Sequence, residues 1–320
     1  MRKIASLALM GLSMLLPLPA LAQADYPNRP ITLVVGYGAG GSTDLASRVA
    51  AAGMEKILGQ PVVVENRTGG NGAVGTQAVF NAAPDGYTIG MTSGSIMTVL
   101  PWTMNLGFDP LQLTYVGSVL ESYYALFSGS QKPWQNIDEF ITAAKASPLV
   151  VANSGGFGIP DIAMAQVAQA AGGFEYRTVP TTGGGEQALR LLSGDVDVSP
   201  NSAAPTLQHV RSGALRPILI LSPSWPELEA MGVPLSTEKF GFSTRNLSAL
   251  VAPPGLPEDI RQKLEDALKQ VMEHPAYTEQ FRNVGELIEF KTGAEIRQAV
   301  EETQAVQRKI GVQLGQALAR

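Results

Sequence analysis

Short apolar segments alternate with segments of helical periodicity along most of this 320-residue chain. Uninterrupted apolar runs of four or five residues, bounded by Gly, Pro or Asn, are typical of buried strands. Apolar residues spaced three and four apart are typical of helices that pack on a sheet. This order predicts an α/β fold with parallel strands and crossover helices. The first strands are expected at Ile31–Val35, Val62–Glu65 and Thr88–Met91, with helices at Asp44–Leu58 and Gly75–Ala83.

The same alternation restarts after Glu121 and predicts a second α/β unit. Its expected strands are Tyr124–Ser128, Leu149–Ala152, Tyr176–Val179, Val196–Ser199 and Leu215–Leu221, with helices near Asp138–Ala146, Asp161–Ala171 and Gly185–Leu192.

The last third of the chain differs, because it holds one expected strand, Leu247–Ala252, and two long amphipathic helices, Pro257–His274 and Ala294–Leu318. Thr292 and Glu295 have the spacing of a capping box at the start of the second helix. These helices have few strands of their own to cover. We therefore expect them to pack on the first sheet, which makes the first domain discontinuous.

Two α/β domains joined by two crossing strands, with a ligand cleft between them, are therefore the predicted architecture. The chain is expected to cross between them near Ser118–Ser122 and near Gly241–Asn246. Residues 23–119 and 241–320 would form the first lobe, and residues 120–240 the second. This arrangement is typical of hinged binding proteins.

The amino terminus has the pattern of a cleavable secretory signal over residues 1–22. Arg2 and Lys3 precede an apolar stretch, Ile4–Leu16, that is too short to span a bilayer, and Ala20 and Ala22 are small enough for signal peptidase. A transmembrane anchor is the alternative. There is no twin-arginine pair and no cysteine for a lipid anchor. We expect a bacterial periplasmic protein whose mature chain begins at about Gln23.

The composition excludes several classes of function. The chain has no cysteine, which removes disulfides, thiolate nucleophiles and thiolate metal sites. Its formal net charge is -5 and it has no Lys/Arg-rich run, which argues against binding to nucleic acid. A hydrophobic content of 45% with 16% charged residues is that of an ordinary globular protein.

A glycine motif follows the first expected strand. Gly36, Gly38 and Gly41 have the spacing of the dinucleotide-binding fingerprint, and Glu65 lies where that fingerprint has its ribose-binding acid. The same glycines also suggest a P-loop, but Ser42 stands where a P-loop has its lysine. NAD and ATP are not normally supplied outside the cytoplasm. We therefore expect no nucleotide and no other cofactor.

Three glycine-rich turns lie between an expected strand and an expected helix: Gly36–Asp44, Asn153–Gly158 and Thr181–Glu186. Glycine allows close approach of the backbone, and the first-turn amides of a helix bind anions readily. Such turns gather at the carboxyl ends of parallel strands, where ligands bind. A fourth small polar turn, Thr92–Ser95, strengthens the prediction of an anion site. Asp44 more plausibly caps its own helix than contacts an anion.

No catalytic or metal-binding constellation stands out. His209 and His274 are the two histidines, and both are expected at the surface. Asp195 belongs to a turn before a strand that holds Asp197, and the two do not form a recognisable carboxylate pair. The sequence therefore predicts a protein that is not an enzyme and that holds no metal.

The mature chain resembles, over essentially its whole length, the extracytoplasmic solute receptors of tripartite tricarboxylate transporters, the Bug family. The resemblance is carried by the stretches YPNRPITLVV, GAGGSTD, LGQPVVVENRTGGNGAVGTQAV, APDGYTIGMTSGS, VPTTGGGEQALRLLSGDVD, LRPILILS and LVAPPGLP. It implies a two-lobed periplasmic binding fold of type II-like architecture. It also implies a carboxylate bound in the cleft and delivered to a two-subunit membrane permease.

The resemblance implies that two loops, Tyr37–Asp44 and Thr181–Glu186, grip one carboxylate from opposite lobes. This chain departs from the family in having GYGAGG in the first loop and Thr181-Thr182 where the second often has Tyr-Lys, so less positive charge is available for a second acidic group. The candidate ligand-binding residues are Tyr37, Ala39, Gly40, Gly41, Ser42, Thr43, Asp44, Ser93, Ser95, Asn153, Ser154, Thr181, Thr182, Gly183 and Gly184.

The main hypothesis is thus a monomeric periplasmic receptor for a small carboxylate, partnered by the permease of a tripartite transporter. One alternative is a periplasmic protein that presents its ligand to a membrane sensor kinase. Another is a secreted hydrolase that uses a glycine-rich turn as an oxyanion hole.

Overall fold

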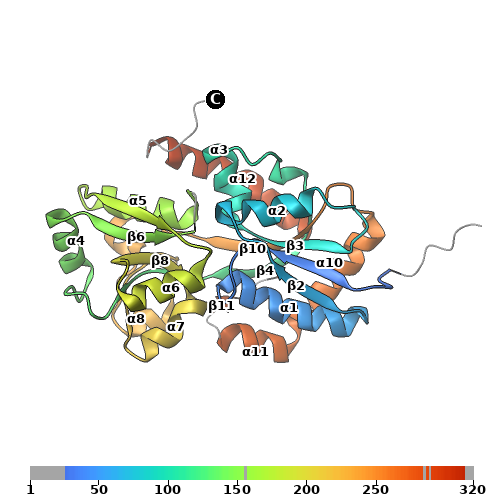
Figure 1. Cartoon of the computed structure of the whole chain (residues 1–320), viewed down its shortest axis with the longest axis horizontal. Helices are drawn as coiled ribbons and strands as arrows, with labels where there is room; N and C mark the ends of the chain where they lie inside the picture. Colours follow the sequence, from blue (N-terminus) through green and yellow to red (C-terminus); the bar gives the residue numbers. More distant parts are fainter. Residues whose placement is uncertain (1–25, 155–156, 284–285, 288–289, 314–320) are drawn as a thin grey trace, which may run out of the picture.

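The computed structural model describes residues 26–154, 157–283, 286–287 and 290–313. Two separate mixed sheets, each covered by helices, form two lobes that lie side by side (Figure 1). The predicted signal peptide and the end of the predicted last helix lie outside the described residues. No helix in the described part of the chain is long and apolar enough to cross a membrane.

The first lobe is built on a six-stranded sheet of order β11-β4-β10-β3-β1-β2. Strand β1 pairs in parallel with both β2 and β3, as the sequence predicts. Strand β10 inserts antiparallel between β3 and β4, so the sheet is mixed and not purely parallel. The strands are β1 Ile31–Val35, β2 Val62–Asn66, β3 Thr88–Ser93, β4 Thr114–Ser122, β10 Asn246–Ala252 and β11 Glu286–Leu287.

The second lobe is built on a five-stranded sheet of order β7-β6-β8-β5-β9. Strand β6 is parallel to β7 and β8, whereas β5 is antiparallel to β8 and β9. The strands are β5 Tyr124–Gly129, β6 Leu149–Asn153, β7 Tyr176–Pro180, β8 Val198–Ser202 and β9 Leu215–Ile220.

Helices cover both faces of the two sheets. The first lobe carries α1 Ser42–Leu58, α2 Ala73–Phe80, α3 Leu100–Thr103, α10 Glu258–Glu273, α11 Pro275–Asn283 and α12 Gly293–Gln313, with the short turns η1 Gly70–Gly72, η2 Ser95–Val99 and η3 Pro110–Gln112. The second carries α4 Ile137–Ala146, α5 Ile159–Ala170, α6 Gly184–Ser193, α7 Ala203–Arg211, α8 Pro226–Ala230 and α9 Ser236–Phe240.

The C-terminal helices return to the first sheet. Leu264 and Leu268 of α10 are fully buried in one cluster with Ile31 and Leu33 of β1. Helix α12 begins with the predicted capping box. The Glu295 carboxylate accepts hydrogen bonds from the Thr292 amide and the Thr292 hydroxyl, and the Thr292 hydroxyl accepts one from the Glu295 amide. The last third of the chain therefore completes the core that its first third begins.

Strands β4 and β10 are antiparallel neighbours in the first sheet, and both extend to its border with the second lobe (Figure 1). Strand β5 of the second sheet follows β4 after the single residue Tyr123. The chain therefore passes from the first lobe to the second directly from strand to strand, and it returns through the loop between α9 and β10.

Candidate ligand-binding cleft

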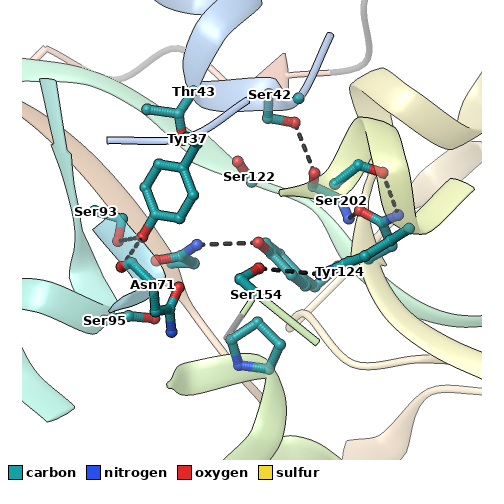
Figure 2. A pocket seen from close by; sticks show the side chains of 16 residues that line it. Tyr37, Ser42, Thr43, Asn71, Ser93, Ser95, Ser122, Tyr124, Ser154 and Ser202 are labelled. Atoms are coloured by element: carbon teal, nitrogen blue, oxygen red, sulfur yellow. Dashed lines mark hydrogen bonds between the residues drawn. The ribbon is translucent and has the colours of Figure 1, made fainter. Parts of the chain in front are cut away.

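A partly enclosed cavity of about 30 Å³ lies where the two lobes meet. Its lining comes from strand ends and helix starts of both lobes, as Figure 2 shows. Every lining side chain is uncharged, and most carry a hydroxyl or an amide: Tyr37, Gly41, Ser42, Thr43, Asn71, Ser93, Ser95, Ser122, Tyr124, Ser154, Pro160, Gly184, Gln187, Asn201, Ser202 and Asn246.

Helix α1 begins at this cavity. Strand β1 ends at Val35, a glycine-rich loop follows, and the helix starts at Ser42. Gly40 has a φ of 82°, a left-handed conformation that glycine adopts without strain. The amides of Ser42 and Thr43 belong to the first helical turn, whose N–H groups have no partner inside the helix. The loop therefore delivers free donors and the positive end of the helix dipole to the cavity.

Asp44 stabilises the loop between β1 and α1 by hydrogen bonds. Its carboxylate accepts hydrogen bonds from the Gly40 amide at 3.0 Å, from Arg48 and from the Asn66 side chain. Burial raises the pKa of Asp44, but the hydrogen bonds from Arg48, Asn66 and Gly40 outweigh it, so the net shift of the pKa is downward. These bonds agree with a structural role for Asp44, which does not line the cavity.

Helix α6 begins on the opposite side, in the second lobe. A Cβ atom placed on Gly41 would lie 3.5 Å from the amide nitrogen of Gly184 and 3.8 Å from that of Gly185. The Gly38 amide also donates to the Thr182 carbonyl at 2.9 Å across the lobes. The amino ends of α1 and α6 therefore face each other, and their dipoles favour an anion between them without any cationic side chain.

Tyr37 forms one wall of the cavity (Figure 2). Its hydroxyl lies 2.5 Å from the Ser93 hydroxyl and donates to the Asn71 carbonyl at 2.9 Å. Burial, the largest cause, raises the pKa of Tyr37 well above its ordinary value. Burial likewise raises the pKa of Tyr124, on the other wall, to about 12. Both phenols are therefore neutral hydrogen-bonding groups at neutral pH.

Two amide side chains of the lining have a polar atom without a protein partner. The Asn71 Nδ2 atom and the Asn246 Oδ1 atom are buried and make no hydrogen bond within the described residues. Asn71 also adopts a left-handed backbone conformation, with a φ of 54°, inside the turn between β2 and α2. Buried polar groups in folded proteins are nearly always paired. These atoms are therefore suited to bind a polar ligand or ordered water.

The two lobes contact each other around the cavity. The Ser42 hydroxyl donates to the Ser202 hydroxyl at 2.8 Å (Figure 2), and the Ile159 amide at the start of α5 donates to the Ser95 hydroxyl at 3.0 Å. Ser95 opens η2, a π-helical turn that directly follows β3. The expected polar turn at Thr92–Ser95 was thus wrong in shape, because β3 continues to Ser93 and leads straight into this helical turn.

The structure gathers about half of the predicted site residues at the cavity and leaves the others beside it. Those that line it are Tyr37, Gly41, Ser42, Thr43, Ser93, Ser95, Ser154 and Gly184. Those that do not are Ala39, Gly40, Asp44, Asn153, Thr181, Thr182 and Gly183.

The residues outside the lining have other contacts. Thr181 and Thr182 line a neighbouring surface depression of about 340 Å³. The Asn153 side chain donates to Asp161, and the Thr181 hydroxyl donates to the Asn153 carbonyl. Gly183 has a φ of 153° at the start of α6, which a larger residue would adopt only with strain. These residues shape the turns whose neighbouring residues line the cavity.

Sequence reasoning missed eight lining residues: Asn71, Ser122, Tyr124, Pro160, Gln187, Asn201, Ser202 and Asn246. Asn71 carried a signal, because it lies in the glycine-rich run Gly69–Gly72 that follows an expected strand. Ser202 and Asn246 lie at the ends of strands whose pairing the sequence did not specify. Nothing in their local pattern marks them.

The nucleotide fingerprint has a packing explanation. A Cβ atom on Gly36 would lie 2.7 Å from the Gly72 backbone, and one on Gly38 would lie 2.7 Å from the Thr182 hydroxyl. The Glu65 carboxylate forms an exposed ion pair with Arg67. The glycine spacing therefore permits close packing of loops within and between the lobes.

Asp197 and His274, considered as catalytic candidates, form structural hydrogen bonds outside the cavity. The Asp197 carboxylate bonds Lys132 and the Val150 amide, which joins β6 to the loop before β8. His274 ends α10 and accepts a hydrogen bond from the Ala276 amide through Nδ1. Neither lies in the cavity lining.

Two α/β lobes around an enclosed polar cleft define the class of periplasmic binding proteins. The sequence model described as "Tripartite tricarboxylate transporter family receptor" matches residues 46–315, and the chain belongs to this family. The resemblance seen in the sequence is thereby confirmed.

Individual relatives agree. The chain is 34% identical, over 99% of its length and 96% of the relative, to the "UPF0065 protein in gbd 5'region" of Cupriavidus necator. It is 30% identical to "Protein BugT" of Bordetella pertussis, over 81% of each chain. The solved structure of the periplasmic binding protein BugD is similar with a TM-score of 0.86 and 26% identity, covering 91% of this chain and 99% of that one.

Proposed function

We propose that this protein is a periplasmic receptor that captures a small carboxylate in the cleft and delivers it to the membrane permease of a tripartite tricarboxylate transporter. The observation that carries the proposal is the meeting of two helix amino ends, one from each lobe, at a partly enclosed cavity with free amide donors. Membership of the transporter receptor family supports the same role and the periplasmic location. We propose lobe boundaries near residue 123, between β4 and β5 and slightly beyond the predicted residue 119, and near residue 241, before β10.

Magnitudes indicate how such a site would reach useful affinity. Two helix ends contribute up to about 2 kcal/mol each in favourable buried geometry. A micromolar Kd corresponds to roughly −8.2 kcal/mol. Direct hydrogen bonds from groups such as Asn71 Nδ2, together with the contacts made when the lobes close, must supply the remainder.

The cavity volume bears on how the ligand enters. A cavity of about 30 Å³ has room for only a few water molecules. A carboxylate larger than its COO⁻ group therefore needs side chains to move or the lobes to separate. Binding by hinged lobes meets this need, because the open form admits the ligand and the closed form surrounds it.

A thermal-shift screen followed by calorimetry tests the proposal. The mature protein would be screened against acetate, butyrate, succinate, citrate and benzoate, with butyramide and benzamide as uncharged controls of matched shape. We expect at least one carboxylate to raise the melting temperature in a concentration-dependent way, as linkage requires, and its amide to fail. Equal binding of acid and amide, or binding of neither class, would contradict a carboxylate receptor.

The permease partner requires a separate test. We expect uptake of the bound carboxylate into membrane vesicles that contain the permease subunits to depend on added receptor. Turnover of the carboxylate by the purified protein alone would instead support the secreted hydrolase. Stimulation of a membrane kinase without uptake would support the sensor alternative.

A further inference from the structure

A buried carboxyl group lies directly behind the cleft. Glu286 belongs to β11, the edge strand of the first sheet, and pairs with Ser122 on β4. The residue is 3% exposed, and both of its carboxyl oxygens are buried without a hydrogen-bond partner. Glutamate is rarely buried to this extent unless it is paired. This side chain is therefore the most unusual polar group of the lobe junction.

Glu286 is in contact with both lobes. The hydroxyls of Ser42 and Ser122, from the first lobe, lie beside its carboxyl group, as does the backbone amide of Ala204, from the second. None of the three completes a hydrogen bond of normal geometry with it. Ser42 and Ser122 also line the ligand cavity, and Ser42 bonds Ser202 across the lobes. The second lobe therefore contributes to the burial of Glu286 through the Ala204 backbone.

No cation compensates this carboxyl group within the described residues, where it forms no ion pair. Tyr124 of β5 is the titratable group that interacts with it electrostatically. The charged side chains of the surrounding elements are paired elsewhere or exposed: Asp44 with Arg48 on α1, Glu121 of β4 with Arg245, Arg211 of α7 with Glu227, and exposed Glu279 and Arg282 on α11. His209, in the last turn of α7, is half-buried.

We propose that Glu286 binds a proton when the two lobes close over the ligand, so that this receptor captures each carboxylate together with one proton. The inference rests on the proposed receptor function. An ionised Glu286 would place a second negative charge beside the bound carboxylate in a region without cations. A neutral Glu286 avoids both that repulsion and the cost of burying a charge.

The direction of the pH effect follows from burial. Burial, the largest cause, raises the pKa of Glu286 to about 8 in the closed structure, against 4.5 for an ordinary glutamate. When the lobes separate, water reaches the carboxyl group and its pKa returns toward the ordinary value. Between pH 4.5 and 8 the closed form therefore holds more protons than the open form. Closure and ligand affinity are favoured at the acidic end of this window and weaken as the pH rises through it.

Calorimetry in two buffers of different ionisation enthalpy measures the proton directly. With benzoate and succinate as probes at about pH 7.5, we expect uptake of a measurable fraction of one proton per bound ligand. The Asp161 carboxyl, whose pKa burial raises to about 6, is already ionised at this pH and does not contribute. Glu286→Gln, which mimics the neutral acid, should abolish the uptake. Glu175→Gln, which removes the same charge at an exposed position, should leave it unchanged.

If the wild type binds ligand without taking up a proton, the inference is overturned by that measurement alone. Equal uptake by Glu286→Gln would also overturn it. Small-angle scattering of the ligand-free protein gives a second readout: the radius of gyration should fall between about pH 8.5 and about pH 5.5 in the wild type and not in Glu286→Gln. If neither probe binds, a carboxylate of the thermal-shift panel that does bind takes their place. If no carboxylate of the panel binds, the proposed function is contradicted, and the scattering comparison alone decides on Glu286.

Discussion

Gly41 lies where the amino ends of α1 and α6 face each other. Its backbone conformation, with φ −81° and ψ 164°, is open to any residue. Because a Cβ atom there would point at the Gly184 and Gly185 amides, a larger side chain would occupy the space that we propose for the carboxylate, and the backbone of Gly41 would need no change. We expect Gly41→Val to weaken carboxylate binding by roughly a hundredfold, about 2.8 kcal/mol, with little change in unfolding free energy.

Calorimetry and chemical denaturation of the Gly41→Val variant check both parts of this prediction. NADH should alter neither the stability nor the fluorescence of the wild type or the variant. Saturable micromolar binding of NADH would show that the glycine motif has its nucleotide function after all.

Asp44 should matter more for stability than for affinity. Asp44→Asn removes the ion pair with Arg48 and weakens the support of the Gly40 loop. Hydrogen bonds to charged groups contribute about 1.5–3 kcal/mol to stability. Because Arg48 is half-exposed and solvent screens its charge, we expect the loss of unfolding free energy to lie near the lower end of this range. Because the pKa of Asp44 is lowered, this stability is complete above pH 3.8 and lost as the pH falls further. Urea denaturation measures the stability of Asp44→Asn, and calorimetry measures its affinity for the carboxylate. A loss of affinity at unchanged stability would instead make Asp44 a ligand contact.

At the scale of elements, the amino end of α6 should be as necessary as that of α1. Gly183 has a φ of 153°, and a Cβ atom on Gly184 would lie 2.7 Å from the Asn201 side-chain oxygen. Replacing both by alanine should displace the first turn of α6 and weaken carboxylate binding at least tenfold. Gly173→Ala, in the loop after α5, is the matched control, because its φ of +90° imposes similar backbone strain in open space. Equal affinity losses in the two variants would mean that general destabilisation is responsible.

The elements themselves were largely predictable. Periodicity located β1, β2 and α1 to within two residues, because apolar spacing is set by the geometry of the strand or helix. The sequence predicts only a crossing where β4 lies, and it predicts a polar turn where the π-helical turn η2 begins. Both depend on partners distant in the sequence, β10 for the first and the contact of Ser95 with Ile159 for the second.

At the scale of the whole molecule, binding should close the lobes. The α1 and α6 loops lie on different lobes, so neither surrounds a carboxylate alone and the ligand must favour the closed form. We expect small-angle scattering to give a smaller radius of gyration with saturating carboxylate than without it. Ser95→Ala, which removes the acceptor for the Ile159 amide, should reduce the closed population. A constant radius would argue for a rigid site, even if carboxylate binding were established.

The sequence by itself determined the α/β class, the two lobes and the two glycine-rich loops, because strand spacing, helix spacing and turn chemistry act over a few residues. Only the tertiary structure decided which side chains share the cleft. Ser122, Ser202 and Asn246 belong to different strands, and their meeting depends on sheet order and on contact between the lobes. Glu286 is buried for the same reason, since β11 pairs with β4 from more than 150 residues further along the chain. Such placements result from long-range packing, which no local pattern encodes.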